Sequence, residues 1–252
     1  MPSVRKRFGQ HFLKDPAVIE RIIGAIAPQP GQRIVELGPG QGALTIPLLR
    51  QLGELYVVEV DRELAAALPE QCADLGRLHL LRQDALKTDF SAFGPAPLQV
   101  VGNLPYNIST PLLFHLLRFP VIRRMLFMLQ KEVVARLCAH AGTPEYGRLS
   151  VMAQARSQAQ HLFDVPPGAF SPPPKVHSAV VELTVAPEAS ARIENFDRFT
   201  ELVRTAFSAR RKKISNGLKP WFNATQLQQL GISPDARPAE LSVGDYIALS
   251  NS

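Results

Sequence analysis

A glycine-rich turn between an apolar strand and a helix most constrains the fold of this chain. Residues 36–42 read Glu-Leu-Gly-Pro-Gly-Gln-Gly. This segment overlaps the end of the strand-like run 34–37 and precedes a short apolar helical segment. A second strand-like run, 55–60, follows. Glycines at such a turn let a ligand approach the backbone closely, and Gly38 and Gly40 also satisfy a permissive dinucleotide pattern. The segment predicts a ligand-binding βαβ unit, with a tight turn that binds nothing as the alternative.

Strands and helices alternate through most of the chain. Asp15 is typical of a helix N-cap and Pro16 of the first helical position, and an apolar stripe continues to Ile26. Further strands are predicted at 78–81, 98–101, 125–129 and 178–185, and further helices at 63–68 and after Asn107. This alternation indicates an α/β fold whose mostly parallel sheet is covered by helices on both faces.

The pattern changes after Pro187. Only helices are predicted there, at 196–208, 214–221, 224–230 and 243–249. A chain of 252 residues is long enough for one full α/β domain and a smaller appended one. We therefore predict an α/β domain over residues 1–186 and a small, all-helical domain over residues 187–252.

The charge of the chain favours a polyanionic partner. It has 28 Lys and Arg against 22 Asp and Glu, which gives a net charge of +6. Basic side chains gather at Arg5, Lys6 and Arg7, and again at 210–213. From charge alone, nucleic-acid contact and an ordinary solvated surface are both open.

Several features limit the compartment and the cofactors. No apolar run is long enough to span a bilayer, and the basic N-terminus lacks an apolar signal core, so we expect a cytoplasmic protein without membrane contact. The two cysteines, Cys72 and Cys138, are not in a metal-ligand or redox spacing. We expect no metal.

Three acidic residues, Glu36, Glu59 and Asp84, lie at the ends of predicted strands. Glu59 stands where a carboxylate reaches the hydroxyls of a ribose held over the glycine turn, and Asp84 stands where an adenine amino group could be bound. Asp84 alone fits a helix cap equally well. Together with Glu36, these acids suit a ligand with a positive sulfonium and no pyrophosphate. The pattern favours S-adenosylmethionine over a dinucleotide.

Asn103-Leu104-Pro105-Tyr106 follows the fourth predicted strand. The amino nitrogen of adenine is a poor nucleophile because its lone pair is delocalised into the ring, so two acceptors must hold its N–H groups. The Asn103 side chain and the Leu104 backbone carbonyl can supply them, and the Tyr106 ring offers a stacking face for the base. The methyl donor is already activated, so we expect proximity and orientation to provide most of the rate. An Asn-Pro turn without chemistry is the alternative.

Phe170 precedes the rigid Pro172-Pro173-Pro174 run. Its ring is either a buried core residue or a second wall of the adenine slot, opposite Tyr106. Both interpretations are open from the sequence.

Other classes of function compete with this interpretation. An enzyme of the same chemistry could act on large-subunit RNA or DNA. A non-catalytic ribosome-assembly factor would keep the basic residues but could lose Asn103 or Glu59, and both are present. An NAD-dependent oxidoreductase would need an acid or base at the hydride site, and we find none.

Taken together, the motifs resemble those of the bacterial small-subunit ribosomal RNA adenine dimethyltransferases and, more distantly, the erythromycin-resistance methyltransferases. The matching segments are Arg5–Leu13, Glu36–Gly40, Val58–Asp61, Gln83–Ala85, Asn103–Thr110, Gln130–Glu132 and Phe170–Val180. Their joint order, over nearly the whole chain, is far more specific than any single motif.

The resemblance implies a Rossmann-like S-adenosylmethionine methyltransferase domain with a helical C-terminal RNA-binding domain. It implies N6,N6-dimethylation of two adjacent adenines near the 3' end of 16S rRNA in the immature 30S subunit, by a protein we expect to be a monomer. The cofactor contacts it implies are His11, Leu13, Gly38, Gly40, Glu59, Asp84 and Asn103. The catalytic residues it implies are Asn103, Leu104, Pro105, Tyr106 and Phe170. The RNA contacts it implies are Arg204, Arg210, Arg211, Lys212 and Lys213.

Overall fold

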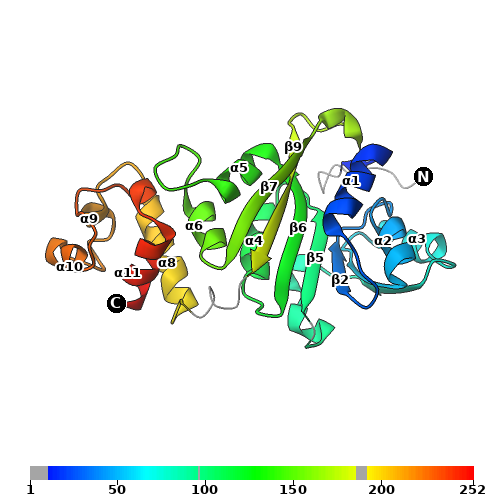
Figure 1. Ribbon diagram of the computed structural model, residues 1–252, viewed down its shortest axis with the longest axis horizontal. Coiled ribbons are helices and arrows are strands. Elements are labelled where there is room, and N and C mark those ends of the chain that lie inside the picture. The colour runs from blue at the N-terminus through cyan, green and yellow to red at the C-terminus, as the bar shows by residue number, and fades with distance from the viewer. Residues whose placement is uncertain (1–10, 96, 186–191) are drawn as a thin grey trace. The chain divides into compact units, whose positions relative to one another are not determined.

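A seven-stranded, mostly parallel sheet organises the larger part of the molecule (Figure 1). The computed structural model describes residues 11–95, 97–185 and 192–252. The basic residues Arg5, Lys6 and Arg7 lie outside these ranges. The strands are β2 (Arg33–Leu37), β3 (Glu54–Val58), β4 (Arg77–Leu81), β5 (Leu98–Asn103), β6 (Ile122–Gln130), β7 (Ser157–Val165) and β9 (Ser178–Val185).

The strand order in the sheet is β4-β3-β2-β5-β6-β9-β7. The five neighbouring strands β4, β3, β2, β5 and β6 pair in parallel. Strand β9 pairs with β6 in the antiparallel direction. A separate two-stranded sheet joins β1 (Phe12–Leu13) to β8 (Phe170–Ser171), segments far apart in the sequence. The predicted α/β class with a mostly parallel sheet is confirmed.

Most of the predicted helices are present. Asp15 caps α1 (Pro16–Ile26) by accepting hydrogen bonds from the backbone N–H groups of Ala17 and Val18. The other helices of the α/β region are α2 (Thr45–Leu52), α3 (Arg62–Gln71), α4 (Ser109–Leu116), α5 (Lys131–Cys138) and α6 (Arg148–Gln154). The C-terminal helices are α8 (Phe196–Ser208), α9 (Ile214–Gly217), α10 (Ala224–Gln229) and α11 (Val243–Asn251). The helix predicted at 214–221 is therefore shorter than expected.

The helices α1, α2 and α3 cover one face of the sheet, and α4 lies on the other (Figure 1). One buried apolar cluster joins residues of these three helices, such as Ile22, Leu48 and Leu68, to the central strands. The amphipathic spacing that predicted the helices thus marks the face that they bury.

Strand β7 was not predicted from the sequence. Its residues read Ser-Gln-Ala-Gln-His-Leu-Phe-Asp-Val, and only the end residues Ser157 and Val165 are buried. It lies at the edge of the sheet. An edge strand pairs on one side only, so it does not need the alternating apolar pattern that identifies a half-buried strand.

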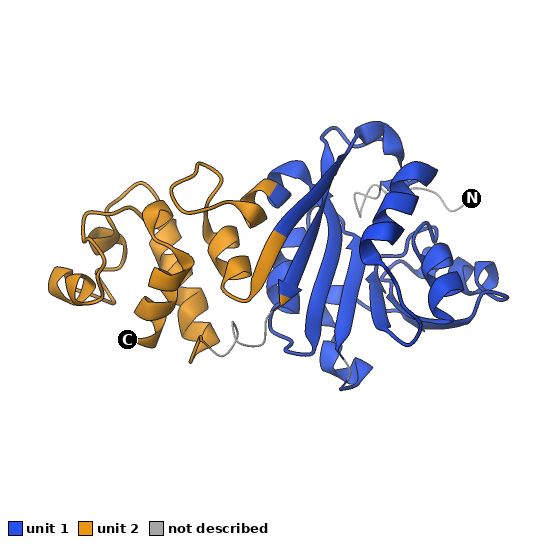
Figure 2. Cartoon of the chain, in the orientation of Figure 1, with its two compact units in different colours: residues 1–134, 160–184 blue, residues 135–159, 185–252 orange. Residues whose placement is uncertain are grey.

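Two compact units divide the chain (Figure 2). Unit 1 consists of residues 1–134 and 160–184, and unit 2 of residues 135–159 and 185–252. Unit 2 therefore includes a segment before residue 187, because α6 packs with α8 and α11. The predicted boundary between a methyltransferase domain and an RNA-binding domain, at residues 186 and 187, lies outside the described residues and stays a prediction. Within the described ranges, no helix has the length and apolar character needed to cross a membrane.

We predict that Gly102→Ala destabilises unit 1. A Cβ on Gly102 would lie 2.5 Å from the backbone carbonyl oxygen of Leu37, so β2 and β5 would have to move apart. Such overpacking costs about 1–3 kcal/mol of unfolding free energy. Gly24→Ala is the control, because no atom lies within 4 Å of the added Cβ there, and it should stabilise the protein slightly. Urea unfolding measures both, and equal effects would contradict the prediction.

Candidate active site

A pocket lies where the central parallel strands end, within unit 1. The register places Leu37 of β2 level with Val58 of β3, and Val58 level with Leu81 of β4. Two further backbone hydrogen bonds continue this ladder, from Gly38 N to Val58 O (2.9 Å) and from Glu59 N to Leu81 O (3.0 Å). The turns that follow the strands therefore meet at one edge of the sheet.

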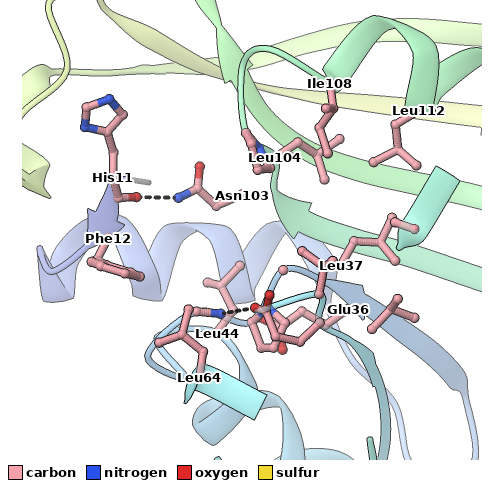
Figure 3. A pocket seen from close by; sticks show the side chains of 18 of the residues that line it. His11, Phe12, Glu36, Leu37, Leu44, Leu64, Asn103, Leu104, Ile108 and Leu112 are labelled. Carbon is pink, nitrogen blue, oxygen red and sulfur yellow. Dashed lines mark hydrogen bonds between the residues drawn. The ribbon is translucent and has the colours of Figure 1, made fainter. Parts of the chain in front are cut away.

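Ten of the eleven residues predicted from the sequence to contact cofactor or target base line this pocket. They are His11, Leu13, Gly38, Gly40, Glu59, Asp84, Asn103, Leu104, Pro105 and Tyr106. Figure 3 shows His11, Phe12 and Asn103 at one side of the pocket and Glu36 with Leu37 at another. Leu104, Ile108 and Leu112 form an apolar wall.

The glycine turn needs glycine for its backbone conformation. Gly38 and Gly40 have φ values of 64° and 57°, in the left-handed region that other residues rarely adopt. A Cβ on Gly40 would also lie 3.2 Å from the Phe12 ring. The turn therefore presents bare backbone to the pocket.

Glu59 is held by backbone donors. Its Oε1 accepts a hydrogen bond from Asp61 N at 2.8 Å, and its Oε2 accepts one from Gly40 N at 3.4 Å. Its side chain is buried, and this burial raises the pKa of the carboxyl group. The carboxylate therefore has a fixed direction beside the glycine turn.

Asp84 lines the pocket and also caps a short 3-10 helix, Ala85–Lys87. Its Oδ1 accepts a hydrogen bond from Leu86 N at 2.9 Å. The two interpretations of Asp84 are thus compatible, because a carboxylate has two oxygens and the cap uses one.

Glu36 is a buried carboxylate, one of the three acids that the sequence indicated for a sulfonium ligand. Its exposed fraction is 2%, and Thr45 Oγ1 donates a 2.7 Å hydrogen bond to its Oε2. Desolvation by burial raises the pKa of Glu36 to about 7, with the Thr45 hydrogen bond opposing the rise and the charge of Glu59 adding to it. The group is therefore poised to change charge near neutral pH.

The charges in the pocket favour a cationic ligand. Three carboxylates, Glu36, Glu59 and Asp84, line it, and no Lys or Arg does so among the described residues. Anionic phosphates would find no cation there, whereas a sulfonium would be stabilised by the carboxylates. The residues fit S-adenosylmethionine better than a dinucleotide.

Asn103 ends β5 and has a defined amide orientation. Its Nδ2 donates a 3.0 Å hydrogen bond to the backbone carbonyl of His11 (Figure 3). The amide oxygen is therefore the group that Asn103 offers as an acceptor. The Tyr106 hydroxyl forms a 2.6 Å hydrogen bond with Ser178 Oγ, and its ring lies 5.9 Å from the His11 ring.

Phe170 is the one of these eleven residues that does not line the pocket. It is 1% exposed, pairs with Leu13 in the two-stranded sheet, and belongs to the apolar core cluster. This placement is that of the core alternative named above. Its predicted contact with the target base stays a prediction.

Several apolar residues of the pocket were missed by the sequence reasoning, among them Phe12 and Val60. Phe12 packs its ring against the glycine turn, and Val60 lines the pocket with 51% of its surface exposed. The position of Val60 in the sequence could have identified it as a pocket residue, because it directly follows Glu59 beyond the end of β3.

The predicted RNA-contact residues lie in unit 2 and differ in their partners. Arg204 pairs with Glu201, and Lys213 pairs with Asp235 at 2.7 Å. Arg210 donates a hydrogen bond to the Tyr146 carbonyl at 3.0 Å.

Arg211 and Lys212 are exposed and have no ion-pair or hydrogen-bond partner for their side chains in the described parts of the chain. Arg210 and Arg211 line a hollow together with Arg237, which the sequence reasoning missed.

Comparisons with solved structures agree with the fold. A dimethyladenosine transferase from Plasmodium falciparum is 27% identical, covers 95% of this chain and 96% of its own, and has a TM-score of 0.83. The 23S rRNA methyltransferase ErmE is 25% identical, covers 95% of this chain and 98% of its own, and has a TM-score of 0.73. The fold and site define a Rossmann-like, S-adenosylmethionine-dependent methyltransferase.

Sequence comparisons give the family. Residues 1–252 match the sequence pattern of a family described as "Ribosomal RNA adenine dimethylase". Proteins called ribosomal RNA small subunit methyltransferase A are similar: that of Aromatoleum aromaticum is 52% identical (98% of this chain, 93% of that protein). That of Alcanivorax borkumensis is 53% identical (98% and 89%). The chain belongs to the ribosomal RNA adenine dimethylase family, whose methyl donor is S-adenosylmethionine.

We predict that Glu36 makes stability fall as the pH rises. The native pKa of about 7 exceeds the ordinary value of 4.5, so the folded state holds this proton after the unfolded state has released it. Stability is then lost from about pH 4.5 to about pH 7, by an amount on the order of 3 kcal/mol. Glu36→Gln should remove this component.

The test compares urea unfolding of wild type and Glu36→Gln at about pH 5 and about pH 8. The variant should gain stability relative to wild type at the higher pH. An equal difference at both values would contradict the prediction.

Proposed function

We propose that this protein dimethylates the N6 amino groups of two adjacent adenines near the 3' end of 16S rRNA in the immature 30S subunit. The observation that carries the proposal is the fixed amide of Asn103. Its N–H donor is bound to the His11 carbonyl, so its oxygen remains to accept an N–H from adenine. The family and the small-subunit relatives support this substrate.

The residues of the Asn103–Tyr106 segment divide the work of holding the base. The Asn103 amide oxygen and the Leu104 backbone carbonyl are the acceptors for the two amino hydrogens. Pro105 limits the backbone conformation of Leu104. The Tyr106 ring is the stacking surface, held by Ser178. Stacking of about 1–3 kcal/mol per base offsets much of the cost of extracting adenine.

The other pocket residues are proposed to hold the methyl donor. The Gly38–Gly40 backbone, Glu59 and Asp84 bind its adenosyl part. His11, directly before β1, and Leu13 of β1 close the pocket. S-adenosylmethionine supplies an activated methyl group, so the chain itself needs only to position the amino nitrogen and exclude water. We assign no general base and no metal, and both assignments stay predictions.

The C-terminal part is proposed to bind ribosomal RNA. Arg210, Arg211 and Lys212 offer cations for phosphates, and Arg237 extends this surface at the same hollow. Arg204 and Lys213 are proposed to contribute less, since their charges are already paired. We expect a monomer that works in the cytoplasm, where small subunits assemble.

The test of the function is transfer of labelled methyl from S-adenosylmethionine to four acceptors, followed by nucleoside identification. The acceptors are undermethylated small subunits, mature small subunits, large-subunit RNA and duplex DNA. Dimethyladenosine on undermethylated small subunits alone is the expected result. Label on large-subunit RNA would favour the substrate of ErmE-like enzymes, and no label despite cofactor binding would favour an assembly factor.

We predict that Asn103→Ala lowers kcat by at least about 100-fold, because a preorganised hydrogen-bonding group at the reacting atom is removed. The affinity for S-adenosylmethionine should stay measurable by calorimetry. Asn103→Asp keeps an acceptor but loses the donor to His11, so it should be intermediate. Turnover equal to wild type in Asn103→Ala would refute the proposed chemistry.

We predict that Arg211→Gln with Lys212→Gln weakens binding to small subunits and reduces the slope of log K against log salt by about 1 per side chain. The matched control is Lys213→Gln, whose charge is paired with Asp235 and should matter less. Filter binding at several salt concentrations measures the slope. An unchanged slope in the double variant would remove these residues from the RNA contact.

A further inference from the structure

A rigid, exposed loop connects β8 to β9 in unit 1. This proline loop comprises residues 172–177, Pro-Pro-Pro-Lys-Val-His, and every residue except Pro174 is exposed. Each proline fixes its own φ, so little conformational freedom remains to be lost on binding. The loop is therefore a preformed surface.

Hydrogen bonds attach both ends of the proline loop to residues of the pocket. At its start, His11 Nδ1 donates to the Pro172 carbonyl at 2.8 Å. Directly after its end, Ser178 Oγ is bound to the Tyr106 hydroxyl at 2.6 Å. His11 and Tyr106 both line the pocket. The loop is thus held beside the side of the pocket where the target base is proposed to stack.

A third bond fixes the end of the loop. Lys131 N donates to the His177 carbonyl at 3.0 Å. Since Ser178 begins β9, the loop ends on the sheet itself and cannot swing away from Tyr106 without breaking strand pairing. The side chains of Lys175 and Val176 project from a surface that is fixed relative to the pocket.

The two exposed side chains carry complementary chemistry. Lys175 has no ion-pair or hydrogen-bond partner in the described ranges, so its charge is available to a ligand. Val176 has 44% of its surface exposed. Among the described residues, the other large apolar side chain that is exposed is Val60, which lines the pocket. A free cation next to an exposed apolar side chain suits a polyanion with apolar base faces.

We propose that the proline loop holds the RNA strand next to the extracted adenine: Lys175 binds a neighbouring phosphate, and Val176 packs against the base that the extraction leaves unstacked. This proposal rests on the proposed function, which requires an adenine to leave its stack. Removing a base from the stack costs a few kcal/mol. An apolar side chain that covers the exposed face of the neighbouring base removes apolar surface from water, which offsets part of that cost.

The Lys175 contact is tested by the affinity for undermethylated small subunits. Lys175→Gln should weaken binding by about threefold to tenfold and reduce the salt slope by about 1. Arg77→Gln is the control, because Arg77 is exposed at the start of β4, the opposite edge of the sheet. Equal salt slopes for the two variants would overturn the Lys175 contact.

The Val176 contact is tested by single-turnover methyl transfer at saturating small subunits. Val176→Ala should slow transfer by about tenfold with little change in affinity, since the side chain acts on the extracted state. Val176→Leu should restore the rate because it restores an apolar contact. An unchanged rate in Val176→Ala, or no recovery in Val176→Leu, would overturn the role.

Two further measurements separate this proposal from other causes. Binding of S-adenosylmethionine and the melting temperature should match wild type in all loop variants, because the altered side chains are exposed. Loss of either would assign the loop a structural role instead. Failure of the wild-type protein to methylate small subunits would refute the proposed function, whereas active wild type with unaffected loop variants refutes only the loop proposal.

Discussion

The parallel pairing of β2 with β3 and β5 is the constraint on which the rest of the structure depends. Val35 of β2 lies level with Tyr56 on one side and with Val100 on the other. Parallel strands with helical crossovers all end at the same edge, and this register makes them end at nearly the same height. Turns with separate sequence signals, such as those at Gly38 and Asn103, therefore form one pocket.

The pocket keeps charges that the fold itself would not favour. Burial raises the pKa of both Glu36 and Glu59, which shows that their charged forms are costly in the protein alone. Each carboxylate is oriented by donors, Thr45 for one and backbone N–H groups for the other. Buried carboxylates without a cation from the protein are what a site for a positively charged ligand requires.

The small β1–β8 sheet connects the pocket to the proline loop, because β1 lines the pocket and β8 leads into the loop. It places His11 so that its backbone carbonyl orients Asn103, while its ring holds the start of the proline loop. Phe12 of β1 packs on the glycine turn. The short segment His11–Leu13 thus contacts the glycine turn, the Asn103 amide and the proline loop.

The sequence by itself determined the fold class, the main strands and helices, and most of the pocket, because the glycine turn, the strand-end acids and Asn103–Tyr106 carry local patterns. It did not identify β7, an edge strand without apolar alternation, and it left Phe170 between two interpretations. Only the tertiary structure shows the edge position of β7, the burial of Phe170 in the apolar core, the orientation of the Asn103 amide and the attachment of the proline loop. The reason is physical: backbone periodicity is a local property, whereas burial and hydrogen-bond partners depend on residues far apart in the chain.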